Sequence, residues 1–600
     1  MKWLAAGLTF VNVATVCALL LGILGHGLSR PIAIASTIIG AGLATLAALQ
    51  TLDPEERNSE ESSSAGTGAR ACFWLLAACF GFFAFRSFCW LIFSDGTQLK
   101  VQSPNNLGDL ALHIAYVKNF ANGVPLWPEN PIYVFSHMRY PAGTDLFNAL
   151  LLLLRVEITR GFIWTGLVAS LATFYALYRW GGLFTVAGFL FNGGLMGFRF
   201  LSTWKLPDYH AEQSIAWKNL ALTMFVTQRG LLYALPAGLL LLYQWRTKYV
   251  TADAGRDQRS RLQPLPYWLE ALLYATMPLF HLHTFMALSI VAAFLFAVGE
   301  KDTRWQLGKL VVIAFLPATF FVWTITDHFQ ARSLLQWKPG WVQTDHDLGG
   351  PFLQFWFVNF GLWPLFVIAL LVFCVWRAAK RERFDFREHQ ALAFLAPAAL
   401  LFLFAWLVKT APWAWDNIKL IIWAYLIMLP FLWRELIAPW PKFVVPGVLV
   451  VLFLPGFVFL LGGLVGKENG FGLADRAEVD AVGAAVRKLP VTARFASYPT
   501  YNHPLLLQGR KVVMGYPGHL WTQGFEYAET NKRLDALMNG AADWREQARR
   551  LQARYLFWGR EEKTHYTASA RLWEREAQLL ASGPWGAIYD LEAGPAGVRE

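Results

Sequence analysis

The chain has 600 residues and a mass of 67.7 kDa, and its composition excludes a string of soluble domains: 56% of the residues are hydrophobic, 16% are charged, and the mean hydropathy is +0.36. The formal net charge of +11 does not require nucleic acid, because basic cytoplasmic loops and contacts with anionic lipid account for such an excess. The five cysteines all lie in apolar stretches and have no metal-ligand spacing, so they imply neither disulfides nor a zinc site. We therefore expect an integral membrane protein that contacts membrane lipids and no nucleic acid.

Thirteen apolar blocks recur along the chain, most of them long enough to cross about 30 Å of hydrocarbon as a helix. They lie near residues 3–25, 31–50, 71–93, 161–179, 181–198, 229–245, 266–282, 284–299, 307–325, 352–376, 390–409, 417–433 and 443–465. A further block at 146–154 is too short to cross by itself and is expected to be a tilted or re-entrant helix. The predicted fold is mainly α, a polytopic membrane protein with about 13 transmembrane helices.

The polarity of the chain divides it into four parts. Residues 1–50 hold two N-terminal transmembrane helices, and the Glu-, Ser- and Gly-rich stretch 51–70 is typical of a disordered linker. Residues 71–465 form the main transmembrane domain, with a large outer loop at 94–145. Residues 466–600 are richer in charge and alternate helix-like with strand-like runs, which predicts a small C-terminal α/β domain.

Two basic clusters predict the orientation. Residues 246–261 and 377–387 each hold five Lys or Arg, which is typical of cytoplasmic loops. Counting spans outward from these clusters places the remaining long polar stretches on the opposite face of the membrane. These stretches are 95–145, 200–228, 328–351, 410–416 and the tail after residue 466. Polar chemistry and the C-terminal domain are thus predicted to be extracytoplasmic.

The outer loop contains a predicted helix at 106–121, with an apolar stripe on one face and Gly123 beyond its end. Asp109 and His113 are four residues apart and share a face of this helix, which we expect to lie along the membrane surface. A carboxylate beside an imidazole can take a proton from a hydroxyl or bind a divalent cation. The alternative is that Asp109 only favours the helix N-terminus while His113 reaches the lipid headgroups.

Further polar residues stand where apolar blocks begin or end, a position that suggests function in membrane proteins. Arg139 and Tyr140 follow a proline-rich run, and Arg139 is suited either to grip a phosphate or to anchor at the interface. The other candidates of this kind are Gln228, Arg229, His281, His283, Asp416, Asn417 and Lys419. Structural roles remain open for them, including hydrogen bonding by the two histidines and a self-satisfied ion pair between Asp416 and Lys419.

The C-terminal part contains one more polar segment, NHPLLLQGRKVVMGYPGHLWTQG at 502–524. Its residues His503, Tyr516 and His519 are candidates for contacts with an acceptor if the segment docks on the membrane cavity. Ordinary turn chemistry, with Trp521 anchored at the bilayer surface, is the equal alternative.

The order of these parts resembles the GT-C class of polyprenyl-phosphate-sugar-dependent membrane glycosyltransferases, in particular a group of bacterial multi-span proteins. The resemblance covers nearly all of the chain after about residue 71. It rests on the segment 502–524 together with GDLALHIAYVKNFANG, YPAGTD, TQRG, PLFHLHTF and WDNIK. It implies a GT-C-like fold in the bacterial cytoplasmic (inner) membrane, with its active face outside the cytoplasm.

The resemblance also implies an activity. A sugar would pass from a polyprenyl-phosphate carrier to a cell-envelope glycan, lipid or protein, with inversion at the sugar carbon. Asp109 matches the catalytic carboxylate that the class carries in its first outer loop. The acidic pair common in the class is absent, because the nearest acidic residue upstream is Asp95. A divalent cation (Mg²⁺, Mn²⁺ or Ca²⁺) is the one cofactor to expect, with Asp109 and His113 as its ligands if it binds.

Two other classes of function compete with this interpretation. A transporter or flippase of lipid-linked glycans would place ionisable groups at mid-span, whereas here they gather at span ends. A non-catalytic GT-C-like scaffold is the third possibility, and the missing acidic partner of Asp109 favours it. The three interpretations differ in whether Asp109 faces a cavity that it shares with Arg139, Arg229 or Lys419.

Overall fold

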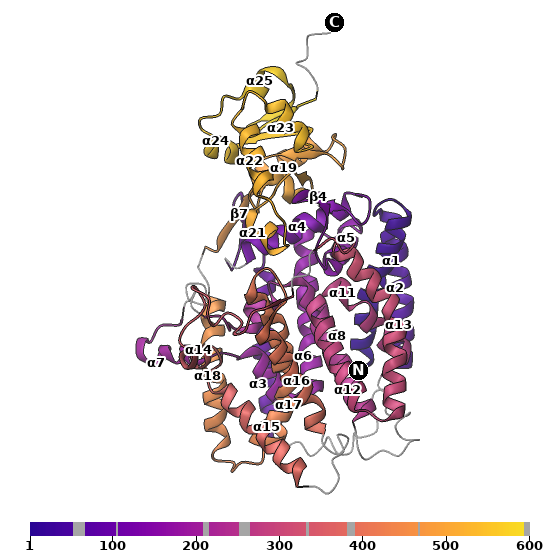
Figure 1. The fold of residues 1–600 in the computed structure, drawn as a ribbon, viewed down its shortest axis with the longest axis vertical. Coiled ribbons are helices and arrows are strands. Elements are labelled where there is room, and N and C mark those ends of the chain that lie inside the picture. The colour runs from indigo at the N-terminus through magenta and orange to yellow at the C-terminus, as the bar shows by residue number, and fades with distance from the viewer. Residues whose placement is uncertain are drawn as a thin grey trace.

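The computed structural model describes residues 1–51, 67–103, 106–207, 215–250, 265–331, 335–380, 390–465 and 469–592. Most of the expected linker at 51–70 and much of both basic clusters lie outside these residues. The elongated molecule has a tall bundle of helices with the C-terminal region stacked on one end of it (Figure 1). One continuous cluster of buried apolar side chains extends through both parts.

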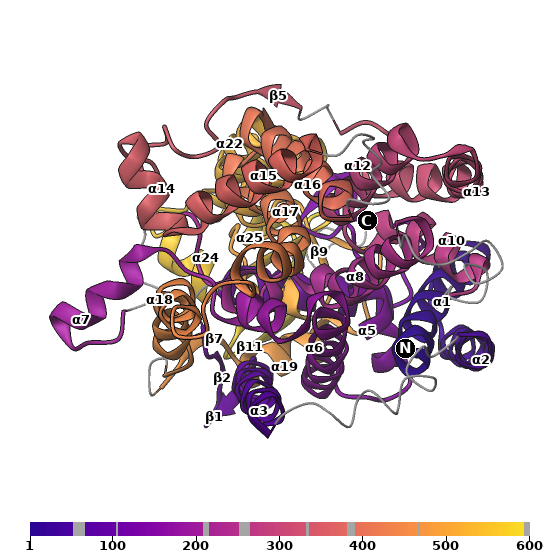
Figure 2. The same cartoon turned by 90° about the horizontal axis from the view of Figure 1, so that it is seen from below.

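The bundle is built from long apolar helices and several shorter ones, which Figure 2 shows nearly end-on. They are α1 (Lys2–Leu24), α2 (Arg30–Gln50), α3 (Thr67–Cys89), α6 (Ile158–Leu190), α8 (Arg229–Tyr249), α10 (Tyr267–Ala275), α11 (Met277–Phe280), α12 (Leu282–Val298), α13 (Lys301–Ile325), α14 (Phe352–Phe360), α15 (Trp363–Ala379), α16 (Gln390–Leu407), α17 (Ile418–Phe431) and α18 (Val445–Val465). Helices α1 and α2 pack closely as a pair, as do α16 with α17 and α6 with α8.

The number of spans differs from the thirteen predicted. In the described part of the chain, seven helices are long and apolar enough to cross a membrane, or eight if the bent pair α14 and α15 counts as one span. The blocks at 161–179 and 181–198 do not form two spans, because α6 runs through the first and ends at Leu190 inside the second. The backbone is non-helical at Gly181 and Gly182, so two helical parts of α6 meet there at a kink, and the second part, which ends at Leu190, is too short to cross by itself. The chain is a multi-pass membrane protein, and its described residues contain fewer full-length spans than the apolar blocks suggest.

Other predicted spans are short or broken. Block 266–282 is divided into α10 and α11 at Thr276, and block 284–299 forms the 17-residue α12. Block 352–376 bends by 92° between α14 and α15. A hydropathy window averages over such breaks, since proline and glycine within an apolar run hardly change its mean hydropathy.

The large outer loop forms a layer on one end of the bundle. Its elements are β1 (Phe93–Asp95), β2 (Gln98–Val101), α4 (Asn106–Ala121), β3 (Glu129–Asn130), β4 (Tyr133–His137) and α5 (Gly143–Leu153). Helix α4 has the predicted bounds, but it does not lie as an open amphipathic helix on the membrane surface. Residues 110–117 are all buried, because the C-terminal region covers the side that does not face the bundle.

The C-terminal region carries a five-stranded sheet. The strand order is β11 (Gln578–Gly583), β12 (Gly586–Asp590), β10 (Tyr555–Gly559), β8 (Arg494–Ala496) and β9 (Lys511–Val512). Strands β8 and β9 run parallel to β10, while β11 and β12 are antiparallel neighbours. The flanking helices are α19 (Arg476–Val486), α20 (Pro504–Leu507), α21 (Pro517–Thr522), α22 (Ala528–Met538), α23 (Trp544–Arg550), α24 (Arg560–His565) and α25 (Leu572–Glu576).

Backbone hydrogen bonds join the C-terminal region to the outer loop. Strand β7 (Phe471–Asp475) pairs with β2, so a strand from each region contributes to the same small sheet. The amide of Val512 donates to the carbonyl of Pro131 at 2.9 Å, and that of Gly515 donates to Ile132 at 2.8 Å. These bonds fix the C-terminal region above α4.

Candidate active site

Asp109 lies in the first turn of α4, where the helix is enclosed between the bundle and the C-terminal region. Its Oδ2 accepts a long hydrogen bond of 3.5 Å from Nε2 of Gln228, the residue that precedes α8. Burial raises the pKa of Asp109, and the neighbouring charges of His113 and Lys419 offset only part of that rise. Such a carboxyl holds its proton more tightly than an exposed aspartate does.

A cavity of about 520 Å³ opens in front of Asp109. It lies where the outer loop, the C-terminal region and the ends of several bundle helices meet. Nine residues singled out from the sequence line it: Asp109, Arg139, Tyr140, Gln228, His281, His283, Asp416, Lys419 and His519. The fold therefore gathers into one site residues that span more than 400 positions of the chain.

The other candidates do not line this cavity. The imidazole of His113 is buried and its Nδ1 lies 2.9 and 3.0 Å from the two carboxylate oxygens of Asp145. Arg229 is buried with its guanidinium carbon 4.5 Å from the ring centre of Phe162. Asn417 donates to the backbone carbonyls of Ala405 and Val408.

Two candidates from the segment 502–524, His503 and Tyr516, also lie outside the cavity lining. His503 is buried within the C-terminal region, where its Nε2 lies 3.1 Å from a carboxylate oxygen of Glu562. Tyr516 remains 41% exposed and packs edge-on against His519. Of the three tail candidates, His519 is the one that lines the cavity with Asp109.

Lys419 is a positive charge in the cavity wall. Its Nζ lies 2.9 Å from Oδ1 of Asp416, three residues before it, and both side chains are largely shielded from solvent. The pair is the self-satisfied contact that the i, i+3 spacing allows, yet both groups also face the cavity. A bound anion can therefore compete with Asp416 for the ammonium group.

His281 offers a hydrogen-bond donor without a partner. It precedes α12, and its Nδ1 accepts the backbone amide of Thr284 at 3.1 Å. That bond leaves the proton of the neutral ring on Nε2. Nε2 is buried and has no hydrogen-bond partner among the described residues, while the side chain lines the cavity. A buried donor of this kind is costly unless a ligand accepts from it.

The C-terminal region closes one side of the cavity with His519. Burial, assisted by the nearby His113, lowers the pKa of His519 to about 4. The ring is therefore neutral at physiological pH. Gly108 makes room for it, since a Cβ at that position would lie 3.2 Å from Nε2 of His519.

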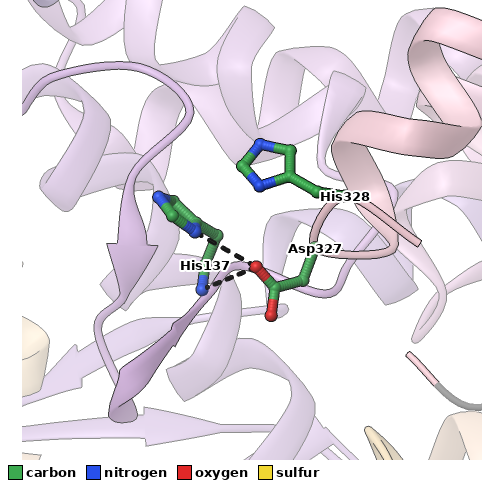
Figure 3. Close-up of side chains that lie close together, drawn as sticks. All are labelled: His137, Asp327 and His328. Carbon is green, nitrogen blue, oxygen red and sulfur yellow. Dashed lines mark hydrogen bonds and ion pairs between the residues drawn. The ribbon is translucent and has the colours of Figure 1, made fainter. Parts of the chain in front are cut away.

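Arg139 is held at the rim of the cavity. Its Nη2 donates to Oδ2 of Asp327 at 3.2 Å, and its guanidinium lies 4.4 Å from the ring centre of Phe525. Asp327 also faces His137 and His328 (Figure 3). Within the described ranges, these three residues are the group whose ligand atoms are close enough to hold a metal ion. Asp109 and His113, the two ligands predicted for a divalent cation, do not belong to such a group. The described residues bring no third ligand to them.

Sequence reasoning missed several residues of the site. Asp327 and His328 lie in the segment TDHF, directly after the end of a predicted span. Their position at a span end is the same signal that indicated Asp416. The cavity is also lined by Lys218, Thr410, Trp413, Trp415, Thr522 and Gln523. For these residues no local pattern distinguished them from other interfacial polar and aromatic side chains.

No family model and no curated protein matches this sequence. Solved structures of an oligosaccharyltransferase from the archaeon Archaeoglobus fulgidus are similar in shape. The structure tethered to an acceptor peptide is 11% identical, with a TM-score of 0.45 over 86% of this chain and 74% of the other. The complex with zinc and sulfate is 13% identical, with a TM-score of 0.46 over 87% and 73%. The complex of AglB with an inhibitory peptide and a dolichol-phosphate is 14% identical, with a TM-score of 0.39 over 86% and 74%. At TM-scores below 0.5, this similarity by itself establishes neither a shared site nor a shared activity.

Proposed function

We propose that this protein is a membrane glycosyltransferase that moves a sugar from a polyprenyl-phosphate carrier to an acceptor hydroxyl or amide of the cell envelope. The observation that carries the proposal is the enclosed Asp109 facing a cavity of about 520 Å³ that it shares with Lys419 and Arg139. A carboxylate beside positive charges at the end of an apolar bundle meets the two needs of this reaction. It offers a base for the acceptor and partners for the lipid phosphate.

Asp109 is the proposed general base. Its carboxylate takes the proton of the acceptor as the acceptor oxygen or nitrogen bonds to the anomeric carbon of the sugar. The bond from that carbon to the phosphate oxygen breaks, and the polyprenyl phosphate leaves with the bonding electrons. Burial raises the pKa of Asp109, which makes its carboxylate a stronger base than an exposed one. Attack opposite the leaving phosphate inverts the anomeric centre.

Lys419 and His281 are the proposed partners of the leaving phosphate. The ammonium of Lys419 can exchange Asp416 for a phosphate oxygen, and Nε2 of His281 has a proton to donate. Arg139 adds a second positive charge at the rim. Donors fixed before the reaction stabilise the charge that develops on the leaving group without reorganising.

Asp416 bears on the scaffold alternative. The sequence lacks a second acidic residue beside Asp109, but Asp416 lines the same cavity and acts on the Asp109 charge. A second carboxylate is therefore available from another helix. In this proposal the cavity and the C-terminal region face the outside of a bacterial inner membrane, where lipid-linked donors and envelope acceptors meet.

The proposal is tested by offering purified protein in nanodiscs a panel of radiolabelled polyprenyl-phosphate sugars with an envelope lipid extract. A new labelled glycoside that requires the protein supports the glycosyltransferase. The same donors are offered in proteoliposomes, where movement of labelled donor across the bilayer without a new glycosidic bond supports the flippase. Neither product nor movement, with the donor shown to bind, supports the scaffold.

A further inference from the structure

A second cluster of ligand-bearing side chains lies beside the cavity, where β4 meets the turn that follows α13. One ligand atom each from His137, Asp327 and His328 lies within 4.8 Å of the others. Figure 3 shows the two imidazoles and the carboxylate converging on a common space. His137 and Asp327 are 190 positions apart in the sequence, so the fold builds this cluster from two distant segments.

The turn that carries two of the residues has an unusual backbone. Asp327, His328 and Phe329 have φ angles of 53°, 58° and 62°, three consecutive left-handed residues without a glycine. Such conformations are unfavourable for residues with a Cβ, and they persist where surrounding contacts hold them, often at ligand sites. Here the contacts are those of Asp327, which accepts from Ser136 Oγ at 2.7 Å and from the amide of His137 at 3.2 Å.

The distance between His137 and Asp327 suits a small tetrahedral ion. Bonds of about 2.0–2.1 Å at tetrahedral angles place neighbouring ligand atoms roughly 3.3 Å apart. Nδ1 of His137 already lies 3.1 Å from Oδ1 of Asp327. The His137 side chain is 42% exposed, so its ring can adjust by a small rotation. Two imidazoles and one carboxylate are typical of Zn²⁺, whereas Mg²⁺ and Ca²⁺ prefer oxygen ligands.

We propose that His137, Asp327 and His328 form a Zn²⁺ site that fastens the outer loop to the end of α13. Oδ2 of Asp327 accepts from Ser136 and Arg139, which orients the carboxylate. Oδ1 accepts from the backbone amide of His137 and has a second lone pair to offer to the metal.

The site differs from the cation site expected from the sequence. It involves neither Asp109 nor His113, and its imidazoles favour zinc over Mg²⁺, Mn²⁺ or Ca²⁺. Three protein ligands leave a fourth position for water or a ligand. Because Arg139 lines the cavity and binds Asp327, the metal also steadies one wall of the candidate active site. The proposal does not depend on glycosyl transfer.

The test is Zn²⁺ binding by the full-length protein, freed of its affinity tag and treated with chelator, in detergent or nanodiscs. Isothermal titration and metal analysis after desalting are expected to give one Zn²⁺ per chain, while Mg²⁺ and Ca²⁺ do not bind at this site. The variants His137→Ala, His328→Ala and Asp327→Asn are each expected to weaken Zn²⁺ binding at least tenfold. Zinc is expected to raise the thermal unfolding midpoint of the wild type and not that of the variants.

The matched control is His346→Ala, which removes an exposed histidine whose Nδ1 lies 3.0 Å from its neighbour Asp347. It is expected to bind Zn²⁺ as the wild type does. Circular dichroism of metal-free His137→Ala, His328→Ala and Asp327→Asn checks that the variants fold. Zinc K-edge absorption that reports two imidazoles in the wild type and one in folded His328→Ala supports the assignment. Wild type without stoichiometric Zn²⁺, or folded variants that retain full affinity, would overturn it.

Discussion

Asp109 illustrates how one enclosed residue joins stability to function. Burial raises the pKa of its carboxyl group, so ionising it at neutral pH costs the folded protein free energy. Its hydrogen bond from Gln228 is long at 3.5 Å, whereas the buried carboxylate of Asp145 lies 2.9 and 3.0 Å from Nδ1 of His113. The weakly bonded carboxyl group of Asp109 is available to react with a ligand. The carboxylate of Asp145, paired with His113, stabilises the fold.

We expect Asp109→Asn to leave the thermal unfolding midpoint at pH 8 unchanged or higher. When the folded pKa of a carboxyl group is raised, the folded state binds more protons than the unfolded state, and stability falls as pH rises from the ordinary pKa to the raised one. The amide removes this cost at pH 8. Asp145→Asn is the control, and we expect it to destabilise the protein by about 1–3 kcal/mol. A lower midpoint for Asp109→Asn than for Asp145→Asn would contradict this assignment.

The pH dependence of sugar transfer provides a second test at this residue. Only the ionised carboxylate of Asp109 accepts a proton, so kcat is expected to fall about tenfold per pH unit below its raised pKa. The midpoint of this acid limb of the pH–rate profile should lie above the ordinary aspartate pKa of about 3.9. His519, with a pKa of about 4, stays neutral over most of this range. A rate that remains constant down to pH 4 would exclude Asp109 as the base.

At the scale of elements, the attachment of the C-terminal region to the outer loop is the most informative contact. Glu129 of β3 lies 2.6 Å from Nη2 of Arg494 in β8 and 2.6 Å from Nζ of Lys511 in β9. The carboxylate thereby joins the outer loop to two strands of the five-stranded sheet. Positioning of His519 over the cavity depends on this attachment.

Glu129→Gln is expected to weaken the attachment by about 1 kcal/mol, since the pair is partly exposed. Burial by itself raises the pKa of Glu129, but Arg494 and Lys511 outweigh it and lower the pKa. The ion pairs of Glu129 therefore stabilise the attachment fully above the ordinary glutamate pKa. This stabilisation is lost as pH falls through the lowered pKa of Glu129. Hydrogen exchange of β9 should be about fivefold faster in the variant at pH 7, the change in opening equilibrium that about 1 kcal/mol produces.

The control for this prediction is Glu546→Gln. Glu546 pairs with Arg550 at 2.7 Å on an exposed helix face, four residues apart. We expect exchange in β9 to match the wild type in this variant. Equal exchange rates in Glu129→Gln and wild type would show that the ion pairs do not fix the C-terminal region.

Packing of α18 offers a prediction within the bundle. A Cβ at Gly456 would collide with the carbonyl oxygens of Phe191 and Asn192, so glycine allows the two segments to approach. Gly456→Ala is expected to destabilise the protein by about 1–3 kcal/mol. Gly447 lies in the same helix, where a Cβ would meet no described atom within 4 Å, and Gly447→Ala should leave the thermal midpoint in detergent unchanged. Equal midpoints for both variants would contradict this packing.

For the molecule as a whole, local sequence patterns predicted local structure well. The bounds of α4 agree with the helix predicted at 106–121. The count of thirteen spans is not confirmed in the described part of the chain, because helix breaks at Gly181 and Gly182, and the 92° bend after α14, do not change mean hydropathy. Those breaks depend on packing against other helices, which no local window contains.

The site was predictable only in part for the same reason. Polar residues at span ends drew attention to His281 and Lys419, and the outer-loop helix drew attention to Asp109. The fold brings these three residues to one cavity. Arg229 carries the same signal but packs on Phe162 instead. The group of His137 with Asp327 requires two segments 190 positions apart to meet, and spacing along the chain cannot reveal this.

The most direct test of the account is single-turnover sugar transfer by wild type and Asp109→Asn in nanodiscs, with donor binding measured on the same samples. We predict that the variant binds the polyprenyl-phosphate sugar normally and transfers it about 100–10,000-fold more slowly. Asp95→Asn, which removes an exposed outer-loop carboxylate paired with Lys100, should transfer at the wild-type rate. Undiminished transfer by a folded Asp109→Asn variant would contradict the central claim that Asp109 is the base.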